Sequence, residues 1–257
     1  MNQLSAIIIT HNEERNIGRC LESLRDVADE VIVVDSGSTD ATEAICQQAG
    51  ARFERHDWEG YSVQKNYANS LASCPWILSI DADEALSPEL RQSLLRWKQE
   101  ETQPALFSFN RLTNYCGHWI HHCGWYPDKV VRVFPAGAAR WDGLVHEKLV
   151  TNPSDLPTHH LSGDLFHYSY YSVEEHAERQ LRYATLAAQK AYDAGKQVGK
   201  LGVRLRPKWN FIRNYIFKLG FLDGHAGYTV CRMSAYYTFL KYSILFQLSH
   251  PSVRGND

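Results

Sequence analysis

The chain has 257 residues, 44% of them hydrophobic and 22% charged, which is typical of a globular protein with one large or two small domains. No uncharged apolar run reaches the ~18–20 residues of a transmembrane helix, and we see no signal-peptide pattern at the N-terminus. Net charge is −2, yet residues 180–257 carry 12 Lys/Arg against 3 Asp/Glu, which favours an anionic partner for this tail. The six cysteines show no disulfide-like framework and indicate a reducing, cytosolic setting.

The first eighty residues alternate between short apolar runs and amphipathic stretches. This pattern predicts strands over residues 5–10, 30–35, 51–57 and 76–80, and helices over residues 16–27, 41–49 and 62–73. Such alternation is typical of a mostly parallel α/β sheet with helices on its faces. Three of the strands end in polar clusters, which are His11-Asn12, Asp35-Ser36 and Asp81 with Asp83. Because open α/β sheets bind ligands at the carboxyl ends of their strands, we expect a binding edge there.

Asp81 and Asp83 directly follow a buried strand and are separated by one residue. They point the same way if the strand geometry persists to its end. Two aligned carboxylates repel each other unless a cation lies between them, and hard oxygen ligands suit Mg²⁺ or Mn²⁺. A strand followed by a solvated acidic turn is the competing interpretation. The chain has neither a Gly-x-Gly-x-x-Gly after its first strand nor a Walker-type loop, which disfavours dinucleotide binding and a P-loop NTPase.

Four motifs in order carry a family resemblance: Ile8-Ile9-Thr10-His11-Asn12-Glu13-Glu14, Val33-Val34-Asp35-Ser36-Gly37-Ser38-Thr39-Asp40-Ala41-Thr42, Lys65-Asn66 and Asp81-Ala82-Asp83-Glu84. Together they resemble the family 2 glycosyltransferases of the GT-A fold. The segment Trp141-Asp142-Gly143-Leu144-Val145-His146-Glu147 and the chain length narrow the resemblance to small bacterial enzymes that glucosylate the inner core of lipopolysaccharide.

The resemblance implies a role for each matching residue of the nucleotide-sugar site, which would comprise Thr10, Glu13, Asp35, Lys65 and Asp81. Asp35 would accept a hydrogen bond from the uracil N–H, since a carboxylate suits an imide donor. Lys65 would neutralise diphosphate charge, although a solvated helix lysine is the simpler interpretation. Asp83 would bind the metal, and Asp81 would contact ribose or a metal-bound water. The family often has a second Asp where this chain has Ser36, so we assign Ser36 no such contact.

Residues 114–129 crowd aromatic, histidine and cysteine side chains together after a helix over residues 87–100 and a strand over residues 105–110. A loop of this composition suits stacking on a sugar acceptor, for which we select Trp125, but core packing of its tryptophans is equally compatible. Structural zinc is disfavoured because two ligand pairs separated by a proper loop are missing. A further strand is expected over residues 128–134, with Arg132 on the same face as Val130 and Phe134.

Glu147 is our first choice as catalytic base, because the resembling enzymes use the acidic residue of the Val-His-Glu motif. An acceptor hydroxyl is a poor nucleophile until a base removes its proton in the transition state. His146 would orient Glu147 or contact the acceptor. His167 ends another strand-like run and would complete the metal shell or contact diphosphate, unless it is a structural histidine.

The last third of the chain is predicted to be helical. Ser172 opens a capping box and a helix to about residue 194, residues 195–206 look like a basic linker, Pro207 begins the next helix, and the last helix covers residues 228–248. Basic, aromatic and apolar residues combined predict either a membrane-surface element or a helical layer on the sheet that forms a dimer interface. We therefore expect a catalytic domain over residues 1–170, with nucleotide-sugar binding in 1–100 and acceptor binding in 101–170, and a helical extension over 171–257.

These observations predict a metal-dependent inverting glycosyltransferase that transfers a hexose, glucose from UDP-glucose, to an envelope glycolipid such as lipopolysaccharide core. We expect it to lie on the cytoplasmic face of the bacterial inner membrane and to have no nucleic-acid partner. A nucleotidyltransferase remains open, although the loop His11-Asn12-Glu13-Glu14 is acidic where such an enzyme normally has a basic, glycine-rich loop. A non-catalytic glycan-binding module also remains open.

Overall fold

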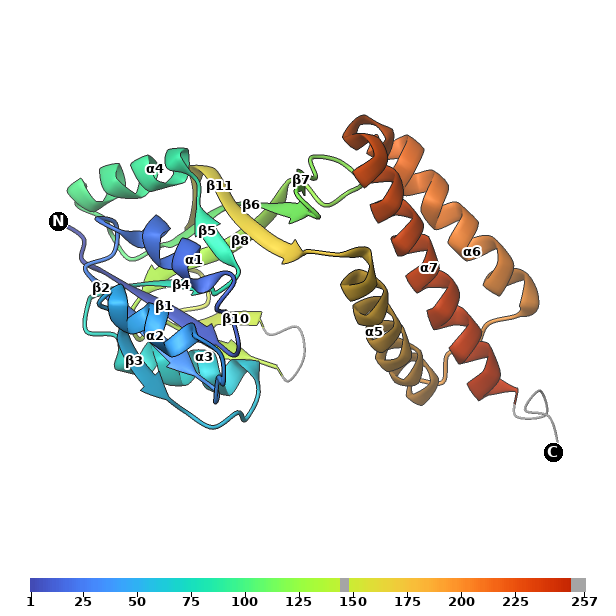
Figure 1. Cartoon of the computed structure of the whole chain (residues 1–257), viewed down its shortest axis with the longest axis horizontal. Helices are drawn as coiled ribbons and strands as arrows, with labels where there is room; N and C mark the ends of the chain where they lie inside the picture. Colours follow the sequence, from blue (N-terminus) through green and yellow to red (C-terminus); the bar gives the residue numbers. More distant parts are fainter. Residues whose placement is uncertain (144–147, 251–257) are drawn as a thin grey trace. The chain divides into compact units, whose positions relative to one another are not determined.

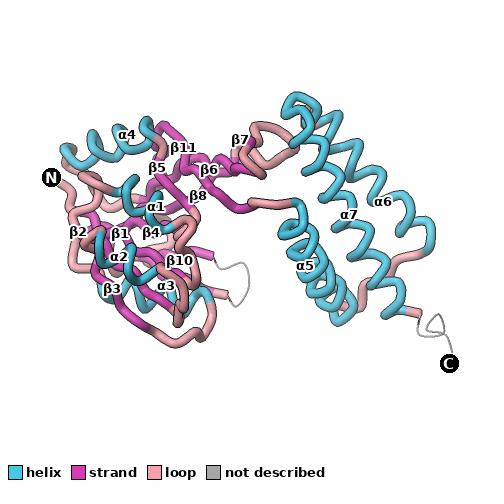
Figure 2. The backbone as a smooth tube through the Cα atoms, viewed as in Figure 1, coloured by secondary structure: helices cyan, strands magenta, loops and turns pink. Residues whose placement is uncertain are grey.

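The computed structural model describes residues 1–143 and 148–250. The chain divides into two compact units, Met1–Leu112 with Asp128–Tyr168, and Thr113–Pro127 with Ser169–Asp257. Figure 1 shows the sheet of the first unit and the long helices of the second, and Figure 2 separates the same elements by type. The segment Thr113–Pro127, which we expected in the acceptor-binding part of the first domain, packs with the C-terminal helices.

The N-terminal half of the first unit is a parallel sheet of four strands in the order β3-β2-β1-β4. These strands are β1 (Leu4–Thr10), β2 (Glu30–Asp35), β3 (Arg52–Arg55) and β4 (Trp76–Asp81). The helices between them are α1 (Ile17–Leu24), α2 (Thr42–Gln48) and α3 (Tyr61–Leu71). The predicted α/β class and the predicted alternation of strands and helices are therefore confirmed.

The sheet continues beyond β4 with antiparallel strands in the order β8-β6-β11-β5. These strands are β5 (Glu84–Leu86), β6 (Leu106–Tyr115), β8 (Asp128–Pro135) and β11 (Thr158–Tyr170). Helix α4 (Pro88–Gln99) joins β5 to β6, and the two-residue strand β7 (His118–Trp119) pairs with β6. The strands β9 (Ala139–Asp142) and β10 (Lys148–Thr151) form a separate antiparallel pair.

The central strands are buried on both faces, as their continuous apolar runs predict. Leu4, Ala6 and Ile8 of β1 pack in a cluster with residues of α1 and α4, whereas Ile7 packs in a second cluster with Ala68 of α3. Because successive side chains of a strand point to opposite faces, β1 contributes to the core on both sides of the sheet. This rigid centre fixes the carboxyl ends of β1, β2 and β4, where the polar clusters lie.

The second unit is built on three helices, α5 (Val173–Asp193), α6 (Lys200–Ile212) and α7 (Gly224–Ser249). A π-helical turn η1 (Arg213–Phe217) and a 3-10 turn η2 (Gly220–Asp223) connect α6 to α7. The predicted N-cap is confirmed, since Ser172 Oγ accepts from the Glu175 N–H at 3.1 Å. The second bond differs from that of a capping box, because Glu175 Oε2 accepts from the N–H of Tyr171, one residue before the cap, at 3.1 Å.

Two predictions about this unit are wrong. Helix α6 begins at Lys200, so residues 200–206 belong to a helix rather than to a linker, and Pro207 lies inside that helix instead of starting it. Proline favours the first turn of a helix because it lacks an N–H, but tertiary packing overrides this preference. Here Val203, one turn before the proline, packs against a cluster that contains Leu245 of α7.

Within the described part of the chain, none of the helices combines the length and the hydropathy that a membrane span requires.

Candidate functional site

Two loops at the carboxyl ends of β1 and β2 are hydrogen-bonded to each other. The Asn12 N–H donates to Ser38 Oγ at 2.7 Å, and Asn12 Oδ1 accepts from the Thr39 N–H at 2.8 Å. Asn12 adopts a φ of 54°, a left-handed conformation that asparagine tolerates better than most residues. The loops therefore hold a fixed shape at the edge where we expected a nucleotide.

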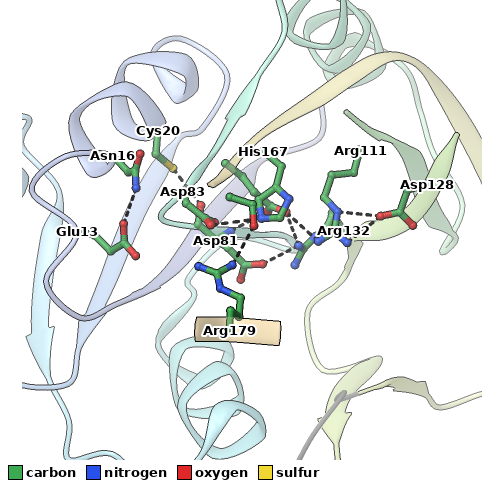
Figure 3. A network of polar contacts seen from close by, with 12 residues as sticks. Glu13, Asn16, Cys20, Asp81, Asp83, Arg111, Asp128, Arg132, His167 and Arg179 are labelled. Carbon is green, nitrogen blue, oxygen red and sulfur yellow. Dashed lines mark hydrogen bonds and ion pairs between the residues drawn. The ribbon is translucent and has the colours of Figure 1, made fainter. Parts of the chain in front are cut away.

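The three residues expected around the nucleoside lie at this edge. Asp35 is buried, and its carboxylate accepts from the Gly37 and Ser38 N–H groups at 2.8 Å each and from Ser38 Oγ at 2.5 Å. Glu13 Oε2 accepts from Asn16 Nδ2 at 2.8 Å, so Asn16 contacts Glu13 instead of capping α1 (Figure 3). Thr10 Oγ1 is buried and has no hydrogen-bond partner among the described residues, which is uncommon for a buried hydroxyl.

Asp81, the last residue of β4, is held by two buried cations. Its Oδ1 lies 3.1 Å from Lys65 Nζ, and its Oδ2 accepts from Arg132 Nη2 at 2.8 Å. Lys65 and Arg132 are only 4% and 5% exposed, so Lys65 is not a solvated surface lysine. Burial by itself raises the pKa of Asp81, but the charges of Arg132 and Lys65 outweigh it and hold the pKa far below its usual range.

Glu84 shares Arg132 with Asp81. Arg132 Nη2 donates to Glu84 Oε1 at 2.7 Å, and Glu84 Oε2 accepts from the Asp81 N–H at 3.0 Å. Arg111 on β6 lies 3.5 Å from Glu84 and also donates to Asp128 at 2.8 Å. Complete burial raises the pKa of Glu84, against the attraction of Arg132. Figure 3 shows Asp81, Arg132, Arg111 and Asp128 in this network.

Asp83 contacts a different partner from Asp81. Strand β4 ends at Asp81, and Asp83 follows in the turn before β5. His167 Nε2 of β11 lies 3.3 Å from Asp83 Oδ2, and the backbone also joins them, since the Tyr168 N–H donates to the Asp83 carbonyl at 2.8 Å. Burial lowers the pKa of His167, but the hydrogen bond and charge of Asp83 raise it above its usual value.

The Asp83 carboxylate suits Mg²⁺ or Mn²⁺ when phosphate and water supply further ligands, and the His167 imidazole beside it offers a nitrogen donor. Residues 1–143 and 148–250 contain no group of three or more His, Cys, Asp or Glu side chains placed to hold a metal. The cations that balance Asp81 are Lys65 and Arg132, and this differs from our expectation of a metal between two aligned carboxylates. The fit for a metal therefore rests on Asp83 and His167.

Lys65 and Asn66 also anchor the segment that leads to the expected catalytic base. Lys65 Nζ lies 4.7 Å from the centre of the Trp141 ring, and Asn66 exchanges two hydrogen bonds of 2.8 Å with the Trp141 backbone. Trp141 belongs to β9, and β10 begins at Lys148. Glu147 and His146 fall between these strands and lie outside the described residues.

Trp125, the other expected acceptor contact, belongs to the second unit. Its ring centroid lies 6.1 Å from that of Tyr115, 5.9 Å from Tyr170 and 6.2 Å from His176. It is partly buried in this aromatic cluster, so packing accounts for a large part of its environment. Of the cysteine and histidine residues around it, His122 Nδ1 and the Cys123 thiol contact Asp223.

Sequence reasoning assigned no role to Arg132, Arg111 or Glu84. Arg132 was expected on one face of its strand with Val130 and Phe134, and Phe134 is fully buried. An arginine on a buried face is the available signal, because a buried cation requires carboxylate partners. The parallel sheet, with Lys65, Arg132 and carboxylates gathered at the carboxyl ends of its strands, places the protein in the class of α/β folds that bind ligands at this edge.

Comparison with known proteins identifies the family to which this chain belongs. The model of glycosyl transferase family 2 matches residues 5–146. The lipopolysaccharide core biosynthesis glycosyltransferase LpsC of Rhizobium meliloti is 32% identical over 98% of this chain and 95% of its own length. An uncharacterized glycosyltransferase of Rickettsia felis is 31% identical over 94% of this chain and 88% of its own length. The chain belongs to glycosyl transferase family 2 and is a glycosyltransferase.

Among solved structures, glucosyl-3-phosphoglycerate synthase from Mycobacterium tuberculosis matches 44% of each chain at 24% identity, with a TM-score of 0.36. This likeness is too partial to carry an argument about the site. Family membership confirms the predicted GT-A glycosyltransferase and sets aside the nucleotidyltransferase and the non-catalytic glycan-binding module.

Proposed function

We propose that this glycosyltransferase moves a hexose from a UDP-sugar, UDP-glucose in the first instance, to a hydroxyl of an envelope glycolipid such as lipopolysaccharide core, with inversion at the anomeric carbon. The observation that carries the proposal is the cluster in which Lys65 and Arg132 flank Asp81 beside the Asp83–His167 pair. The similarity to LpsC supports the choice of acceptor class.

The donor would lie along the carboxyl ends of β1, β2 and β4. Thr10, Glu13 and Asp35 would surround the nucleoside, with the orphan Thr10 hydroxyl as a ready hydrogen-bonding group. Lys65 would face the diphosphate, which accumulates negative charge as the leaving group departs. Asp81 would contact the ribose or a metal-bound water.

Asp83 and His167 would hold Mg²⁺ or Mn²⁺, and such an ion, when bound, offsets the charge on a leaving diphosphate. Asp81 pairs with Lys65 and Arg132, so these cations keep one carboxylate of the acidic motif ionised next to the Asp83–His167 pair. The local charge is therefore close to balanced before a ligand binds, which limits the repulsion of an incoming diphosphate.

Glu147 would remove the proton from the acceptor hydroxyl as that oxygen attacks the anomeric carbon from the face opposite the diphosphate. His146 and Trp125 would contact the acceptor. A single displacement inverts the configuration of the transferred sugar. We further propose that the enzyme works as a peripheral protein on the cytoplasmic face of the bacterial inner membrane, where its glycolipid acceptor is assembled.

Product analysis tests this function. The purified chain is incubated with Mn²⁺, UDP-glucose and a lipopolysaccharide-core acceptor that lacks its outer sugars, and the products are analysed by mass spectrometry and NMR. We expect a hexose added to the acceptor with an inverted anomeric configuration, and one UDP released per transfer. Transfer from another nucleotide sugar but not from UDP-glucose would overturn the donor assignment, and a retained configuration would overturn the mechanism.

A further inference from the structure

An exposed apolar stripe runs along α6 and η1 in the second unit. Its members are Leu201, Leu205, Trp209, Ile212 and Ile216, with exposed fractions between 39% and 67%. Residues three or four places apart lie on the same face of a helix, so these side chains form one continuous row. None of the residues of α6 is buried, and Val203, outside the stripe, packs against the cluster that contains Leu245 of α7.

The turn that follows the stripe also displays large apolar side chains. This apolar tip consists of Phe217, Leu219, Phe221 and Leu222, with exposed fractions between 44% and 66%. Leu219 adopts a φ of 54°, a left-handed conformation that is uncommon for residues other than glycine. Strained backbone that presents exposed apolar side chains is typical of a functional turn, since neither feature stabilises the isolated unit.

Basic side chains accompany the stripe. Residues 195–250 contain nine Lys/Arg and a single acidic residue, Asp223. The Asp223 side chain is 5% exposed and accepts hydrogen bonds from His122, so it adds little negative charge to the surface. Lys200, Arg204 and Lys208 each precede a stripe residue by one position, are exposed, and therefore lie along its flank.

A groove of about 640 Å³ lies beside the stripe, between α6 and α7. Its apolar lining includes Phe211, Ile212 and Phe239. Three cations also line it, Arg204, Lys208 and Arg232, and the described lining contains no carboxylate. Apolar walls with basic groups suit an amphiphile that has an acyl chain and an anionic head group.

We propose that the stripe, the apolar tip and this groove form a docking surface for an anionic phospholipid bilayer. The apolar side chains would enter the interface between head groups and acyl chains, and the cations would contact the head groups. Exposed Trp, Phe and Leu favour lipid over nucleic acid as the anionic partner. A second copy of this chain is disfavoured because it would bring two surfaces of the same strong positive charge together. The purpose of docking, access to a glycolipid acceptor, rests on the proposed function.

Vesicle binding tests the surface without any sugar transfer. The full chain is sedimented with vesicles of phosphatidylcholine alone or with added phosphatidylglycerol, at low and at high salt. We expect binding to the anionic vesicles that weakens with salt. The pair Trp209→Ser/Phe217→Ser and the pair Arg204→Glu/Lys208→Glu should each weaken it by about tenfold or more. Leu186→Ser and Lys190→Glu on α5, which change exposed residues outside the surface, should bind as the unchanged chain does.

Thermal unfolding and sedimentation velocity of each variant accompany the vesicle assay. The proposal is overturned if the folded wild-type chain fails to bind anionic vesicles, or if the α5 variants lose as much binding as the surface variants. It is also overturned if the wild-type chain self-associates and the stripe variants become monomeric without any change in vesicle binding. Transfer to a water-soluble core oligosaccharide, measured separately, decides the proposed function, so a failure of one proposal is distinguishable from a failure of the other.

Discussion

Arg132 of β8 donates to Asp81 at the end of β4 across 2.8 Å, although 51 residues separate them in the chain. Their strands lie where the parallel half of the sheet meets the antiparallel half, since β4 pairs with β8. The same nitrogen, Arg132 Nη2, also donates a hydrogen bond to Glu84 Oε1 at 2.7 Å. One buried guanidinium therefore fixes two carboxylates of the Asp81-Ala82-Asp83-Glu84 motif.

Arg132→Met removes this shared cation and leaves Asp81 and Glu84 without their common partner. We expect the free energy of unfolding to fall by about 3–5 kcal/mol, because breaking a buried ion pair strands its charge. Urea denaturation followed by circular dichroism measures the change. Arg25→Met is the matched control, since Arg25 pairs with Glu22 on the surface and the expected loss is at most about 1 kcal/mol. Equal losses for the two variants would contradict the structural role of Arg132.

Lys65→Met tests the proposed diphosphate contact. The variant loses the cation next to Asp81, and we expect the Kd for UDP to rise by about tenfold or more, because charge-assisted contacts to phosphate contribute strongly to binding. Lys65→Arg keeps the charge and should recover part of the affinity. Calorimetry gives both constants, and thermal unfolding shows whether each variant is folded. A folded Lys65→Met chain that binds UDP with unchanged affinity would rule out the assigned contact.

Glu147→Gln tests the proposed base. A glutamine cannot accept the proton, and general-base catalysis contributes about 10²–10⁴-fold, so we expect kcat to fall by that factor. The affinity for UDP should stay unchanged, because Glu147 is assigned to the acceptor side of the reaction. The exposed Glu100→Gln serves as the control and should keep full activity. If Glu147→Gln transfers sugar at the wild-type rate, another group is the base.

The stability of the second unit should depend on pH through the buried side chain of His176. It is fully buried, with its Nδ1 3.1 Å from Tyr115 Oη and its Nε2 2.8 Å from Gln180 Nε2, which suits a neutral ring. Burial, with a smaller contribution from the charge of Arg179, lowers the pKa of His176 to about 4. The folded state thus resists a proton that the unfolded chain accepts near pH 6.5.

The contribution of His176 to stability is therefore complete above about pH 6.5 and is lost as the pH falls towards 4. We expect a loss of about 2–3 kcal/mol over this range in the wild-type chain beyond that of His176→Phe, which does not titrate. Urea denaturation at several pH values measures the difference. His118→Phe, at an exposed position, should follow the wild-type profile. If the wild-type chain and His176→Phe lose stability alike as the pH falls, then His176 has the same pKa in the folded and unfolded states, which contradicts this prediction.

Local sequence patterns predict the parallel half of the sheet well, because each of its strands is a short apolar run followed by an amphipathic helix. They do not reveal pairing between distant segments. The antiparallel order β8-β6-β11-β5 depends on contacts between strands up to about 80 residues apart in the chain, such as His167 of β11 opposite Glu84 of β5. For the same reason the pairing of Arg132 with Asp81 was not predicted.

At Pro207 a local sequence preference gave the wrong prediction because tertiary packing overrides it. Proline normally starts a helix, yet α6 begins seven residues earlier because its first turns pack on α7. For Lys65, the sequence predicted the helix that carries it but not the burial of its side chain. Its helix was expected, whereas its burial between Asp81 and the Trp141 ring requires the fold of the whole first unit.

Titration of UDP into the protein with Mn²⁺ present, repeated with chelator and with the Asp83→Ala variant, tests the central claim most directly. We predict binding that requires Mn²⁺ in the wild-type chain and is lost in Asp83→Ala, while Asp155→Ala at an exposed position binds as wild type does. Binding of UDP that is equally tight with chelator, or that survives in Asp83→Ala, would contradict a donor site built around a metal at Asp83.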